Sequence, residues 1–97
     1  MNVCEWLAAG EVVTFLYQGR QREVKIAVHG THVDTGTEQI RGYQVGGSSS
    51  QGELPGWRLF KVANMSGVAS SGVPIGQLPA DYNPDDLHLH VHCHVVV

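Results

Sequence analysis

The sequence has few charged side chains, and a minority of them are positive. Only 15% of its 97 residues are Asp, Glu, Lys or Arg, and six cations against nine acids give a formal net charge of −3. Binding of nucleic acid through bulk electrostatics requires clustered Lys and Arg, so the overall charge argues against it. All six cations nevertheless lie between Arg20 and Lys61, which leaves room for a local basic face.

Long apolar runs and cysteine frameworks are absent as well. No run reaches the roughly 18 apolar residues of a membrane span, and the N-terminus lacks the charge and apolar stretch of a secretory signal. Cys4 and Cys93 are far apart and show no framework spacing. We therefore expect a cytoplasmic protein without membrane association and with reduced thiols. A bridge between the two cysteines would require the chain ends to meet, and such bridges are rare in reducing compartments.

What the sequence does contain is a series of short segments with β-type alternation, separated by many of its twelve glycines. A chain of this length forms a single domain. The segment 66–79 is rich in Gly, Ser and Pro and is expected to be irregular. The pattern predicts a helix over about 2–9 and strands over about 11–18, 22–29, 38–46, 57–64 and 87–96. The fold predicted is mainly β, a small SH3-like or Sm-like five-stranded antiparallel barrel with a short N-terminal helix.

The stretch 40–65 has the pattern of a β-hairpin, with a polar loop over 46–56 between its arms. Both arms carry cations next to aromatic residues, a combination that binds nucleotides and single strands by stacking and by anion contacts. The alternative is that the aromatic rings lie in the core while the charged groups extend to solvent. The residues concerned are Arg41, Tyr43, Trp57, Arg58 and Lys61.

The last predicted strand has one apolar face and one face made only of histidine, namely His88, His90, His92 and His94. Side chains two apart on a strand are ~6.5 to 7 Å apart, so neighbouring imidazoles can converge on zinc or another transition metal. Four in a line cannot all reach one tetrahedral ion, and the nearest further ligands are His29, His32 and Asp34. The alternatives are a solvated face, or an edge strand that pairs with a second copy in a homodimer.

An enzyme is not expected. Cys4 and Cys93 are the strongest nucleophile candidates, and in an alternating strand Cys93 faces away from the neighbouring histidines. No nucleophile, base and orienting group can be assembled from neighbouring positions. We therefore expect no cofactor other than the metal considered above.

The order of motifs LAAGEVVTFLYQGRQREV, IRGYQVGG, GWRLFKVANM and DYNPDD resembles the WYL domain, in particular its short stand-alone relatives in bacteria. The resemblance implies an Sm-like barrel preceded by a helix, and a ligand-sensing role in transcription regulation or phage defence. It matches Tyr17 to the tyrosine of the first strand and Arg41 to Tyr43 to the naming segment. Arg58 and Lys61 match basic positions of the following strand. Two departures are Ile26, where a proline is usual, and an incomplete naming tripeptide.

The resemblance also implies a basic, aromatic pocket for a nucleotide, single-stranded nucleic acid or other small anionic ligand. Most family members carry a DNA-binding or enzymatic domain, so this chain is expected to act through a protein partner that supplies the output domain. Together the hairpin and the resemblance give the candidate ligand-binding residues Tyr17, His29, Arg41, Tyr43, Trp57, Arg58 and Lys61.

Overall fold

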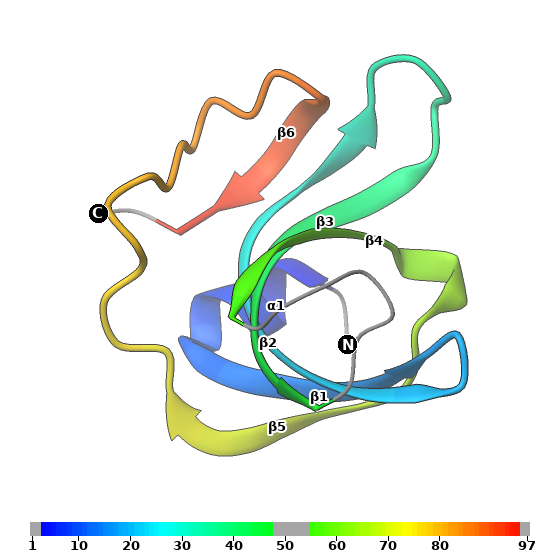
Figure 1. The fold of residues 1–97 in the computed structure, drawn as a ribbon. Helices are drawn as coiled ribbons and strands as arrows, with labels where there is room; N and C mark the ends of the chain where they lie inside the picture. The colour runs from blue at the N-terminus through cyan, green and yellow to red at the C-terminus, as the bar shows by residue number, and fades with distance from the viewer. Residues whose placement is uncertain (1–2, 48–54, 96–97) are drawn as a thin grey trace.

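The computed structural model describes residues 3–47 and 55–95, and these form a mainly β domain with one short helix (Figure 1). Within these residues, six antiparallel strands make a single sheet. In chain order the elements are α1 (Val3–Ala9), β1 (Glu11–Tyr17), β2 (Arg20–His32), β3 (Glu38–Gly47), β4 (Gly56–Lys61), the 3-10 helix η1 (Val62–Asn64), β5 (Ser66–Pro74) and β6 (Leu89–His94). No helix in this part of the chain is long and apolar enough to cross a membrane.

The sheet is organised around β2, its longest strand. The strand order is β4-β3-β2-β1-β5, and β6 lies off this path. The first half of β2 pairs with β1 as far as Val24, and the second half pairs with β6 from Val28 to His32. β3 runs along the other side of β2. One strand thus connects the two halves of the molecule.

The sheet curls strongly, so that β4 comes to lie over β1. The ring of Phe60 on β4 is 5.2 Å from that of Phe15 and 5.0 Å from that of Tyr17, both on β1. In a flat sheet, three strand spacings would separate these strands by about 14 Å. The curled sheet encloses these rings with Val13, Val24, Ile26 and Ile40 in the main core. Within residues 3–47 and 55–95 no pairing joins the edge strands β4 and β5, so the sheet is not closed into a barrel.

The N-terminal helix has the expected form. Val3 and Leu7 are buried against the main core, and Trp6 packs partly against it. Gly10 adopts a φ of +69°, and its N–H donates to the carbonyl of Leu7. A left-handed glycine is a common way to end a helix, because it lacks the Cβ that would clash. The prediction placed the helix over 2–9, and residue 2 lies outside the described residues.

The strand count of the sequence prediction is wrong by one, because residues 66–74 form β5 and are not irregular. β5 is almost fully exposed, and within the described residues it pairs with β1 alone, with two register shifts. Such a strand is formed by backbone hydrogen bonds and has no alternating apolar face, so hydrophobic periodicity cannot reveal it. The predicted fourth strand is also too long, because η1 begins at Val62.

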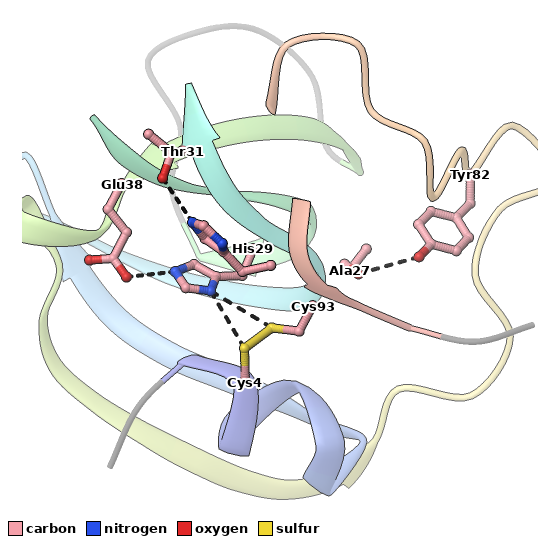
Figure 2. The surroundings of a disulfide bond; sticks show 8 residues. Cys4, Ala27, His29, Thr31, Glu38, Tyr82 and Cys93 are labelled. Atoms are coloured by element: carbon pink, nitrogen blue, oxygen red, sulfur yellow. Dashed lines mark hydrogen bonds and ion pairs between the residues drawn. A yellow bond between two sulfur atoms is a disulfide. The ribbon is translucent and has the colours of Figure 1, made fainter. Parts of the chain in front are cut away.

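The second half of β2 and β6 form a smaller core with the loop that connects β5 to β6. Ala27 and Val28 pack there with Leu78 and Leu89. Gly30 lets β6 approach closely, since a Cβ at this position would overlap the carbonyl oxygen of His90. The loop is fixed by Tyr82, whose hydroxyl donates to the carbonyl of Val95 at 2.7 Å (Figure 2 shows this hydroxyl beside Ala27).

Candidate functional site

The candidate ligand-binding residues of the hairpin lie on two sides of the sheet. Tyr43 pairs with Trp57 across β3 and β4, whereas Arg58 pairs with Gly42. Because successive residues of a strand point to opposite faces, Arg41, Tyr43 and Trp57 share one face and Arg58 faces the other way. The structure therefore does not bring the five hairpin residues into one recess.

On the first face, three aromatic rings form a connected surface. The Tyr43 and Trp57 rings meet edge to face at 5.2 Å. The Trp57 and Tyr82 rings are 6.0 Å apart and nearly parallel, at 21°. They border a cleft of about 330 Å³ between the hairpin and the loop that precedes β6. The cleft is lined by Arg41, Trp57, Asp81, Tyr82, Asn83, Asp86, Leu87 and His88.

An ion pair lies in the wall of this cleft. Arg41 donates through Nε to Asp86 at 2.8 Å and through a terminal nitrogen at 3.4 Å, and the Asp86 side chain is only 7% exposed. Asp86 also accepts the His88 backbone N–H. Burial by itself raises the pKa of Asp86, but the hydrogen bonds from Arg41 and His88 and their charges outweigh it and lower the pKa. The carboxylate is therefore held in its charged form.

The charge of the cleft differs from the basic pocket predicted. Asp81 is a second acid in its wall and accepts a hydrogen bond from the Trp57 indole N–H at 3.0 Å. Arg41 is opposed by Asp86, so the lining carries one more negative than positive charge when His88 is neutral. An isolated phosphate is not favoured in such a cleft, whereas a ring that donates hydrogen bonds is.

Tyr17 and Arg58 line a second, smaller cavity of about 70 Å³ on the other side of the hairpin. The Tyr17 hydroxyl accepts the backbone N–H of Lys61 at 3.0 Å, while the side chain of Lys61 is exposed. The unexpected member of this cavity is Arg22, which is 3% exposed. Burial is the main cause that lowers its pKa, followed by the charge of Arg20.

The guanidinium of Arg22 is stabilised by neutral groups. It donates to the carbonyl of Tyr17 at 3.2 Å and to the Gln44 side chain at 3.3 Å, and it lies 5.6 Å from the centre of the Tyr17 ring. Its Nε has no hydrogen-bond partner among the residues that the structure describes. Alternation along β2 could have revealed its burial, because Arg22 has the same parity as the core residues Val24 and Ile26.

The four histidines of the last strand do not converge. The register between β2 and β6 shifts between His29 and Gly30, with the result that His92 has no partner residue in the ladder. His92 is hydrogen-bonded to Thr31 at 2.8 Å, and His88 stacks on His32 with ring centres 6.3 Å apart. All four histidines are among the described residues. No three of these four histidines place ring nitrogens within reach of one metal ion.

His29 belongs to neither cavity and lies against a disulfide (Figure 2). Cys4 on α1 and Cys93 on β6 are bonded, which corrects the prediction of reduced thiols. The Nδ1 of His29 is 3.6 Å from the Cys4 sulfur and 3.7 Å from the Cys93 sulfur. Its Nε2 is 2.6 Å from a carboxylate oxygen of Glu38 on β3. Side chains from four elements, α1, β2, β3 and β6, thus meet at this imidazole.

No protein-family model, curated protein or solved structure matches this chain. The resemblance to the WYL domain therefore stays a prediction from the sequence.

Proposed function

We propose that this protein is a non-enzymatic binding module that holds a flat ligand in the cleft beside Trp57 and Tyr82. The observation that supports this most directly is the pair of nearly parallel rings next to the Arg41–Asp86 ion pair, at the edge of a cleft of about 330 Å³. Small-molecule sites are typically concave and apolar with a few fixed polar groups. This cleft has both features.

The ligand class that fits best is a nucleobase, either free or in a nucleotide or short single strand. A base can stack on an aromatic ring, which contributes about 1 to 3 kcal/mol per base in single-strand binding. The carboxylate of Asp81 is exposed and can accept from an exocyclic amine. The negative lining predicts that phosphate groups stay outside the cleft, so affinity should depend little on salt.

The resemblance to the WYL domain adds a regulatory role to this proposal. The five strands β1 to β5 would correspond to an open form of the SH3-like or Sm-like barrel, with the curl of the sheet in support. Occupation of the cleft would strengthen the attachment to β4 of the loop that carries Asp81, Tyr82 and Asp86. A partner protein with an output domain would then respond to this loop.

Calorimetric titration with adenosine, cytidine, their monophosphates and a short single-stranded DNA tests the proposal. We expect the nucleosides to bind as well as the monophosphates, and Trp57→Leu to lose at least tenfold in affinity. Arg58→Ala is the matched control, because Arg58 lies on the opposite face and should leave binding unchanged. Equal loss in both variants, or no binding by any nucleoside, would refute the cleft as the site.

A second candidate function is binding of a single anionic group in the small cavity beside Arg22. The supporting observation is that Arg22 is 3% exposed, that its guanidinium has neutral hydrogen-bond partners, and that its Nε has none among residues 3–47 and 55–95. Inorganic phosphate titrated at low salt should shift the NMR signal of the Arg22 Nε–H, and added salt should reverse the shift. An unchanged Arg22 signal at all phosphate concentrations would eliminate this candidate.

A further inference from the structure

We infer that the reduced protein binds a zinc ion through Cys4, Cys93 and His29, at a site separate from the cleft and independent of its function. The two sulfurs and the His29 Nδ1 all lie within 4.8 Å of one another. His29 is buried, and the cysteines are partly buried. Two thiolates and one imidazole form a known type of zinc site that leaves a fourth position for water.

The distances already match the coordination of zinc. Bond lengths of about 2.3 Å to sulfur and 2.05 Å to nitrogen, at tetrahedral angles, place nitrogen and sulfur ligands about 3.6 Å apart. The His29 Nδ1 is 3.6 and 3.7 Å from the two sulfurs. The imidazole therefore needs little movement. Only the sulfurs must separate, to about 3.8 Å by the same arithmetic.

Glu38 gives the imidazole the tautomer that a metal requires. A carboxylate can only accept, so the 2.6 Å contact means that the His29 Nε2 carries the proton and donates it. In the neutral imidazole the Nδ1 then presents its lone pair to the sulfurs. Histidine ligands of zinc commonly donate their other ring N–H to a carboxylate, which orients the ring and makes it a stronger ligand. Figure 2 shows Glu38, His29 and the two cysteines in this order.

The disulfide has to be reduced before zinc binds. A dithiol supplies two electrons and two protons: the Cys4–Cys93 bond breaks, two thiols form, and the dithiol closes to its own disulfide. Zinc then displaces the two thiol protons, and its two positive charges balance the two thiolates. In both states the same residues connect α1 to β6, by a covalent bond in one and by a metal ion in the other.

The test compares zinc binding by the oxidised and the reduced protein. A phosphine is the preferred reductant, since it reduces the disulfide while being oxidised to the phosphine oxide with oxygen from water, and it does not chelate zinc as a dithiol does. Zinc is titrated anaerobically against a chromophoric chelator, and cobalt is used to detect thiolate-to-metal absorption. We expect one equivalent to bind to the reduced protein and none to the oxidised protein.

Two sets of variants make the test specific. Glu38→Gln changes a half-exposed surface position and leaves both cysteines in place, and it should weaken zinc binding 10- to 100-fold. His29→Ala should weaken it further. The double change His90→Ala, His94→Ala is the matched control and should have no effect. Equal binding by the oxidised protein, the absence of cobalt–thiolate absorption, or loss of binding only in the control would overturn the inference.

Discussion

Arg41 and Asp86, 45 residues apart in the chain, are joined by two hydrogen bonds that hold the loop before β6 against β3. The ion pair lies in one wall of the cleft and joins the hairpin to the loop that also carries Tyr82. The two side chains of the ion pair differ in their exposure to solvent: Asp86 is 7% exposed and Arg41 is 22% exposed. Loss of the acid would therefore leave a partly buried guanidinium without its counter-charge.

Asp86→Asn should lower the free energy of unfolding at pH 7 by about 1.5 kcal/mol, the scale of a hydrogen bond to a charged group. The pKa of Asp86 is lowered in the folded protein, so its contribution is present above the unfolded value of about 4 and is lost as the pH falls through the folded value. Urea unfolding at pH 7 and pH 3 should show the variant and wild type converging in acid. Asp85→Asn, at an exposed neighbouring position, is the control and should unfold like the wild type at both pH values.

Replacing both cysteines by serine should lower the free energy of unfolding by about 3 to 4 kcal/mol relative to the oxidised wild type. The bridge closes a loop with a sequence separation of 89, and release of that loop adds entropy to the unfolded chain. Denaturation in urea with a metal chelator present measures the difference. Reduced wild type should then match the serine variant, and a large difference between these two would show that the substitution has another effect.

Phe60→Leu should lower the free energy of unfolding by about 1 to 2 kcal/mol, because the edge-to-face contacts with Phe15 and Tyr17 across the curled sheet are lost. Leu16→Ala, at a position of β1 that is 46% exposed, should change it by less than about 0.5 kcal/mol. Thermal unfolding followed by circular dichroism distinguishes the two. If Leu16→Ala were the more destabilising change, the assignment of the inner face of β1 would be incorrect.

Gly30→Ala should weaken the attachment of β6 to β2, because the added methyl group overlaps the His90 carbonyl. The strands must separate locally, at a cost of about 1 to 3 kcal/mol. Amide hydrogen exchange should increase over 89–94 while β3 and β4 stay protected. If the whole sheet of the Gly30→Ala variant were equally protected, the close approach of β6 to Gly30 would not be needed for the pairing of β2 with β6.

Local patterns in the sequence predicted much of the fold. Positions 3, 6 and 7 followed by Gly10 predicted α1, and alternation around Val24 and Ile26 predicted the centre of β2. β5 could not be predicted in this way, because an exposed edge strand has no buried face. The histidine strand illustrates a different limit. Its alternation is perfect in the sequence, but the register shift opposite Gly30 depends on β2 and changes which neighbour each histidine meets.

The site was predicted less well than the fold. Trp57 and Arg58 were assigned to one pocket, although consecutive residues of a strand point to opposite faces, and this alternation could have been used. Asp81 and Tyr82 lie in an irregular loop, where no periodicity indicates a contact with Trp57. The disulfide requires α1 and β6 to meet, and this is a tertiary contact that cysteine spacing alone does not determine.

The most direct measurement of the central proposal, ligand binding at the Trp57–Tyr82 cleft, is an NMR titration of the two indole N–H signals with adenosine. Trp57 lines the cleft, while Trp6 packs against the main core and serves as an internal reference. The account predicts a saturable shift of the Trp57 signal with an unchanged Trp6 signal, and loss of the shift in Tyr82→Leu. A Trp57 signal that stays fixed at saturating adenosine, or equal movement of both signals, would contradict it.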